Sequence, residues 1–121
     1  MATRSRIGIE NENGTISSIY CHFDGYPDGV GATLKEHYSN RQKLRMLINL
    51  GDISILEEHV ATMDEHSFDN RKEGVTVAYH RDRGEEKREA REDRSLEAFS
   101  KSDYEEFGYV YTKDEKWVTF H

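Results

Sequence analysis

The feature that most constrains the fold is the Asn13-Gly14 pair, which stands between two runs rich in apolar, β-branched and aromatic residues. Asn-Gly suits the positive φ angles of a type I′ turn. The flanking segments 6–10 and 15–23 are therefore predicted to pair as a β-hairpin.

The register of this hairpin follows from the turn. With Asn13-Gly14 as a two-residue turn, Ile7 would face Tyr20 and Ile9 would face Ser18. Ile19 would then lie on the opposite face of the hairpin. This mixed pattern indicates that both faces are partly covered, or that a bulge shifts the register.

Two helices are predicted after a loop at 23–31 that holds three glycines and a proline, residue types that work against regular structure. Residues 32–38 form the first helix. Residues 41–50 form the second, with Ser39 or Asn40 as its N-cap and Gly51 just past its end. Residues 53–63 are ambiguous and could hold another helical turn or two.

The second half returns to strands. Residues 74–80 are predicted as a strand, Ser95 as the N-cap of a short helix, and 109–111 with 117–120 as a second hairpin. The run 81–94 holds six basic and six acidic residues. Such a balanced run is typical of a solvated surface, which is the prediction for residues 87–94 in particular.

These elements predict one domain over residues 1–121, since no repeat and no Pro/Gly/Ser-rich linker divides the chain. The expected class is α+β, an antiparallel sheet of about five strands with two or three short helices on one face.

Charge and composition exclude several classes of protein. The 24 acidic residues outnumber the 17 basic ones, giving a net charge of −7, and no basic stripe is interleaved with aromatic residues, so nucleic acid is not expected as a direct ligand. No apolar run approaches the roughly 18 residues of a membrane span. The single cysteine cannot form an internal disulfide, which favours a reducing, cytoplasmic location.

The densest group of reactive side chains lies in residues 20–26. Cys21, His22 and Asp24 could serve a hydrolase, but neighbouring residues on a strand point to opposite faces, so Cys21 and His22 should not meet. Cys21 is better interpreted as a small core residue. A zinc site needs about four ligands at recognisable spacing, so neither a metal nor another cofactor is expected.

A second candidate region is the strand end at 79–85. Arg81 and Arg83 could hold a phosphate or carboxylate bidentately, with His80 beside them. The glycine-rich loop 23–31 runs into a helix, where backbone N–H groups attract anions. The carboxylates of Asp24 and Asp28 in the same loop would repel an anion. A tight strand-to-helix connection is therefore the simpler interpretation of the loop.

Five segments occur together in one order along the chain. They are Thr3-Arg4-Ser5-x-Ile7, Tyr20-Cys21-His22-x-Asp24-Gly25-Tyr26, Leu50-Gly51-Asp52-Ile53-Ser54, Glu65-His66-Ser67-Phe68 and Val75-x-Val77-Ala78-Tyr79-x-Arg81-Asp82-Arg83-Gly84-Glu85. With these segments the chain resembles a family of small proteins common in tailed bacteriophages and mobile elements. The resemblance implies an accessory protein made in the host cytoplasm and implies no catalytic residues.

Three hypotheses about function follow. The favoured one is a non-enzymatic accessory protein that binds and modulates a host protein, for host takeover or against host defence. It predicts an exposed aromatic or apolar patch around Tyr26 and Tyr38. The second is a binder of a small anionic ligand, such as a nucleotide signal, in a pocket shared by loops 24–31 and 81–85 or formed across a homo-oligomer. The third is an enzyme using His22, Asp24 or Cys21, and a virion component is a further alternative. The candidate binding residues are Tyr20, His22, Asp24, Tyr26, Tyr79, His80, Arg81 and Arg83.

Overall fold

The structure is a computed structural model that describes residues 2–61 and 72–121. The predicted motif at 65–68 lies outside the described residues. In the described part, seven strands form one mixed sheet, in the order β4-β3-β2-β1-β6-β7, with β5 beside β2. The strands are β1 (Ser5–Glu10), β2 (Ile16–Cys21), β3 (Ile53–Ile55), β4 (Val77–Ala78), β5 (Arg91–Asp93), β6 (Phe107–Tyr111) and β7 (Trp117–Phe120).

The α+β class agrees with the prediction, but the sheet differs from it in two ways. It has seven strands where about five were expected. It is also mixed, because β1 runs parallel to β6 and β2 runs parallel to β3. The two unexpected strands, β3 and β5, are only three residues long each, which is too short to show an alternating pattern.

The first hairpin forms where predicted, with a register one residue away from the expected one. Ile7 faces Ile19, and Ile9 faces Ser17. The cause is the loop: the Asn11 N–H donates to the Thr15 carbonyl at 2.8 Å, so three residues and not two make the turn. The left-handed residue that such a three-residue loop needs is Gly14, with φ +88°.

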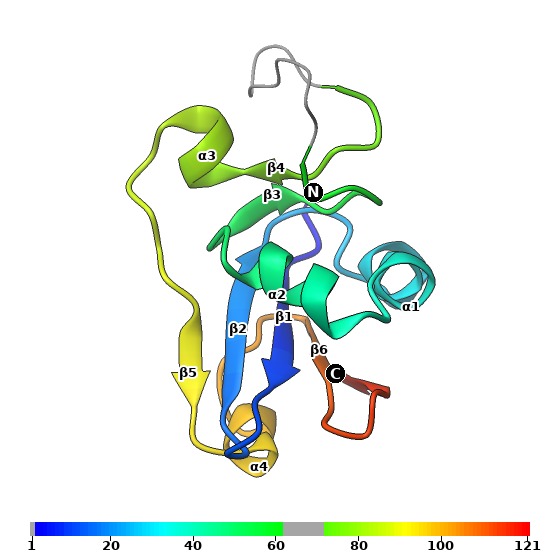
Figure 1. Cartoon of the computed structure of the whole chain (residues 1–121), viewed down its shortest axis with the longest axis vertical. Helices are drawn as coiled ribbons and strands as arrows, with labels where there is room; N and C mark the ends of the chain where they lie inside the picture. The colour runs from blue at the N-terminus through cyan, green and yellow to red at the C-terminus, as the bar shows by residue number, and fades with distance from the viewer. Residues whose placement is uncertain (1, 62–71) are drawn as a thin grey trace.

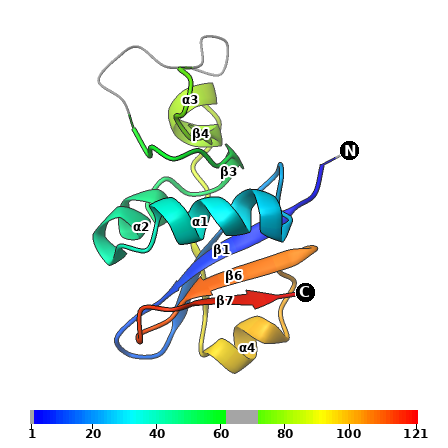
Figure 2. The ribbon, with the colours of Figure 1, turned by 90° about the vertical axis from the view of Figure 1, so that its right-hand side faces the viewer.

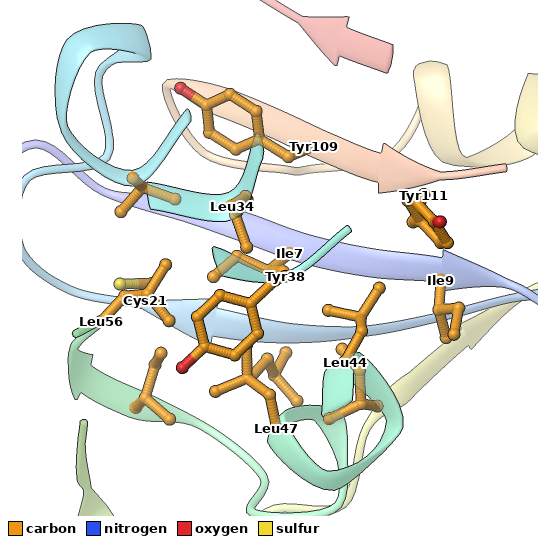
Figure 3. Packing of buried hydrophobic residues seen from close by; sticks show 14 of the residues in the cluster. Ile7, Ile9, Cys21, Leu34, Tyr38, Leu44, Leu47, Leu56, Tyr109 and Tyr111 are labelled. Atoms are coloured by element: carbon orange, nitrogen blue, oxygen red, sulfur yellow. The ribbon is translucent and has the colours of Figure 1, made fainter. Parts of the chain in front are cut away.

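Helices cover both faces of the sheet, which corrects the prediction of helices on one face. Figure 2 shows α1 (Ala32–His37) and α2 (Arg41–Ile48) on one side and α4 (Leu96–Ser100) on the other. On the first side a buried cluster includes Ile7, Ile9 and Tyr38 (Figure 3). On the second side Ile16 packs with Phe99 and Val110. The expectation from the mixed hairpin pattern, that both of its faces are partly covered, is confirmed.

The predicted helix caps are confirmed. The Asn40 side chain accepts the Lys43 N–H at 3.0 Å, and the Ser95 side chain accepts the Ala98 N–H at 3.0 Å. Each bond satisfies one of the N–H groups that a helix leaves unpaired at its start. Gly51 follows α2 with φ +78°, the left-handed conformation expected of a residue just past a helix end.

Two local predictions were wrong, and a third segment had been left ambiguous. Of residues 74–80, only β4 is a strand, and the chain then turns into the short helix α3 (Tyr79–Arg83), where Asp82 accepts the Ala78 N–H. In the ambiguous segment 53–63, residues 53–55 form β3, and residues 62 and 63 lie outside the described residues. The loop 23–31 contains a single π-helical turn, η1 (Pro27–Gly31).

Candidate functional site

The candidate site begins at a gap along one edge of β2. β3 pairs with β2 only at Cys21, and β5 pairs with it only at residues 16–18. Tyr20 lies between these two short strands, where no strand of the described residues accepts its backbone N–H. The Asp52 carboxylate fills that role, accepting the Tyr20 N–H at 3.0 Å. A carboxylate is thereby fixed beside a tyrosine at the sheet edge.

Residues 84–90, which we call the arch, pass over this gap. The arch connects α3 to β5 along the outside of the sheet, as the yellow-green segment of Figure 1 shows. It approaches the end of α2 so closely that a Cβ on Gly51 would overlap the backbone carbonyl oxygen of Arg88. Gly51 therefore serves two purposes, the left-handed turn after α2 and the close passage of the arch.

Local hydrogen bonds fix the start of the arch. The Glu85 N–H donates to the Tyr79 carbonyl at 3.2 Å, and the Gly84 N–H donates to the His80 carbonyl at 3.1 Å. His80 Nδ1 lies 2.8 Å from the Glu85 carbonyl oxygen. Gly84 has φ +76°, which ends α3 and turns the chain into the arch.

Between the arch and the sheet edge lies a hollow of about 290 Å³. Its wall combines two phenol rings, an imidazole, three carboxylates and one guanidinium. The volume is close to the lower end of the roughly 300–1,000 Å³ range of ligand pockets, so it suits one side chain or a small molecule. The lining residues are Tyr20, Asp52, Tyr79, His80, Glu85, Glu86 and Arg88.

Tyr20, which lines the hollow, contacts His22, which does not. The two residues share one face of the end of β2, and the Tyr20 hydroxyl lies 2.6 Å from His22 Nδ1. Burial raises the pKa of the Tyr20 phenol, so this tyrosine stays neutral at physiological pH. His22 in turn packs edge-on against the Phe23 ring, with 4.5 Å between ring centroids. His22 thus supports the wall of the hollow from outside.

The three residues of the enzyme hypothesis are not brought together. Cys21 is fully buried, its thiol points to the Phe23 carbonyl at 3.5 Å, and burial raises its pKa to about 12. Such a thiol does not supply a thiolate near neutral pH. Asp24 is exposed on the loop with φ +58°. Among the described residues no hydrogen bond or ion pair joins it to His22.

The loop 23–31 contributes no residue to the hollow. Its backbone is held on the other side of the structure, where the Tyr109 hydroxyl donates to the Gly25 carbonyl at 2.7 Å. Tyr26 is 42% exposed, but Tyr38 is fully buried, with its hydroxyl on the Glu57 carbonyl. The expected patch around both tyrosines is therefore wrong for Tyr38, which is a core residue.

The two arginines of the anion hypothesis are engaged elsewhere. The Arg81 guanidinium bonds both carboxylate oxygens of Asp82, at 2.9 and 3.0 Å, and the Thr76 carbonyl at 2.7 Å. Arg83 Nε lies 3.1 Å from a Glu85 carboxylate oxygen. Neither arginine lines the hollow. Arg81 instead connects α3 to the Thr76 carbonyl just before it in the sequence. These bonds occupy N–H groups of the guanidinium that a phosphate would need.

Three of the predicted residues therefore line the hollow, namely Tyr20, Tyr79 and His80. Sequence reasoning missed four lining residues, Asp52 and the arch residues Glu85, Glu86 and Arg88. A signal for Asp52 existed in its position directly after the glycine that ends α2. Glu86 and Arg88 lie in the charge-balanced run, where no pattern distinguishes a lining residue from a solvated one.

The described residues 2–61 and 72–121 contain no group of three or more His, Cys, Asp or Glu side chains placed to hold a metal ion. In the same part of the chain, no helix has both the length and the apolar character needed to cross a membrane. The site is thus a hollow at the sheet edge that combines aromatic walls with three carboxylates. Comparisons with known protein families, with curated proteins and with solved structures find no match.

Proposed function

We propose that this chain is a non-enzymatic binding protein whose hollow beneath the arch docks a partner protein. On the resemblance to phage accessory proteins, the partner is a component of the bacterial host whose activity the binding changes. The observation that carries the proposal is the hollow itself. It gathers recognition groups, namely Tyr20, Tyr79 and several carboxylates, around a gap in the sheet edge.

The chemistry of the hollow supports recognition over catalysis. Tyrosine gives large contact area at low entropic cost and is enriched where binding energy concentrates. The one cysteine is buried with a raised pKa, and His22 is held by Tyr20, away from Asp24. The nucleotide alternative has less support, because the lining carboxylates would repel phosphates and the two arginines proposed to hold them lie outside the hollow.

The test is affinity capture of the tagged chain from host lysate, with the eluate divided between protein identification and small-molecule mass spectrometry. Glu86→Lys reverses a charge on the arch. Glu12→Lys makes the same charge change at the exposed turn between β1 and β2, and it is the matched control.

We expect a stoichiometric host protein with the wild type and with Glu12→Lys, and at least tenfold less of it with Glu86→Lys. Equal capture by both variants would place the interface elsewhere and overturn the proposal. A retained nucleotide without any protein would favour the small-ligand alternative instead.

A further inference from the structure

Resting on the proposed function, we further infer that the hollow accepts an arginine side chain of the partner protein. The inference names the ligand chemistry, an alkyl guanidinium, which the proposal above leaves open. It depends on three features of the lining residues: their charge, their aromatic walls and the fixed orientation of one carboxylate.

The charge of the wall favours a cation. Asp52, Glu85 and Glu86 bring three carboxylates to the wall. Two guanidinium groups oppose them, that of Arg88 in the lining and that of Arg83, which pairs with Glu85 at 3.1 Å, so the carboxylates are still in excess. Arg6, whose pKa is raised by the charge of Asp52 but lowered more by its own burial, lies outside the lining. Its guanidinium is held by the hydroxyl and carbonyl of Ser18, at 3.0 and 2.9 Å. The net charge of −7 adds a long-range attraction for a basic partner.

The aromatic walls favour a flat cation. Tyr20 and Tyr79 both line the hollow, and a guanidinium stacks on a phenol face more readily than an ammonium does. The volume of about 290 Å³ suits a single long side chain better than a folded segment of a partner.

The orientation of the Asp52 carboxylate favours a ligand with two parallel N–H donors. Its Oδ1 accepts the Tyr20 N–H at 3.0 Å, which restrains the orientation of the carboxylate. Its Oδ2 accepts no hydrogen bond from the described residues. A fixed carboxylate with a vacant oxygen suits the parallel N–H groups of a guanidinium, whereas an ammonium would gain less from this geometry.

The test is a nuclear magnetic resonance titration of the ¹⁵N-labelled full chain with N-acetyl-arginine methylamide. Control probes are the lysine and citrulline counterparts; citrulline has nearly the shape of arginine but no charge. We expect millimolar binding of the arginine probe, with shift changes confined to the amides around Tyr20, Asp52 and residues 79–88. The citrulline probe should bind at least tenfold more weakly, and the lysine probe about threefold more weakly.

Two variants check the residues. Asp52→Asn keeps an oxygen for the Tyr20 N–H but removes the charge. It should lower the affinity for the arginine probe about tenfold. Glu86→Gln should weaken it about threefold, because this exposed carboxylate is partly screened. Glu12→Gln should leave binding unchanged. Unaltered amide shifts in β1 and β6 verify that each variant is folded.

Equal binding of the arginine and citrulline probes, or no effect of Asp52→Asn, would overturn the inference. Free arginine binding much more tightly than the blocked probe would assign the hollow to a metabolite and not to a partner side chain. If the host protein is captured and Glu86→Lys releases it while no arginine probe binds, the inference fails and the proposed function stands. If the arginine probe binds but both charge-reversal variants capture equally, the proposed function fails.

Discussion

Replacing Gly51 with alanine tests how tightly the arch is held against α2. Alanine in the left-handed conformation of Gly51 costs about 1–2 kcal/mol of folding free energy. Its Cβ would also overlap the Arg88 carbonyl oxygen, which belongs to the backbone and cannot rotate away. The arch must then shift outward, so we expect a total loss of about 2–4 kcal/mol.

The matched control is Gly14→Ala. Gly14 has φ +88°, and a Cβ there meets no atom within 4 Å. This substitution should therefore cost only the free energy of placing alanine in the left-handed conformation, about 1–2 kcal/mol. At this chain length each kcal/mol lowers the melting temperature by roughly 3–6 °C. Urea unfolding gives the two free energies, and amide exchange of residues 85–90 reports on the arch.

The result that supports the account is a loss at Gly51 at least about 1 kcal/mol larger than at Gly14, with faster exchange across the arch. If the two glycines cost the same and exchange in the arch is unchanged, the close contact between Arg88 and Gly51 does not hold the arch. The description of the hollow would then be wrong.

Three further outcomes are expected. Cys21 should react with a thiol reagent at pH 8 only after denaturation, because burial raises its pKa to about 12; rapid reaction of the native protein would contradict this. Stability should fall as the pH rises from about 10 through about 12, since burial raises the pKa of Tyr38 to about 12 and the folded state holds the phenol proton longer than the unfolded state does; urea midpoints independent of pH in this range would contradict it. Arg81→Ala should cost about 2–4 kcal/mol, because it removes the guanidinium bonded to the Asp82 carboxylate, whose side chain is only 2% exposed. Lys87→Ala in an exposed pair should cost under about 0.5 kcal/mol; equal losses would contradict this expectation.

The parts of the fold that could be predicted from sequence carry strong local signals. Asn40 and Ser95 act as helix caps through their own side chains, and Gly51 takes the left-handed turn after α2. Each of these signals is contained within a few residues of the chain. For the same reason the two long hairpins were identified, since their strands are long enough to show alternation.

The errors occur where a hydrogen bond between nearby residues competes with the expected strand pattern. The hairpin register depends on the bond from Asn11 to Thr15, which adds one residue to the turn and moves Ile19 to the face of Ile7. The strand predicted at 74–80 is cut short because the Asp82 side chain turns back to the Ala78 N–H. Neither choice between competing hydrogen bonds is visible in a hydrophobic pattern.

The candidate site was only half predictable for a related reason. Tyr20 and Tyr79 were singled out as aromatic residues at strand ends, and both line the hollow. Asp52 becomes a site residue only because β3 and β5 leave a gap along β2, which is a property of the sheet. Arg81 was assigned a ligand role on its charge, although its charge is used by Asp82.

The central claim, that the hollow beneath the arch is the docking surface, is tested most directly by site-specific photo-crosslinking in host cells. A photoreactive phenylalanine analogue would replace Glu86 in one variant and Glu12 in another, both of which are exposed in the structure. The account predicts one discrete covalent adduct with a host protein from position 86 and none from position 12. An adduct of the same protein from position 12, with none from position 86, would contradict it.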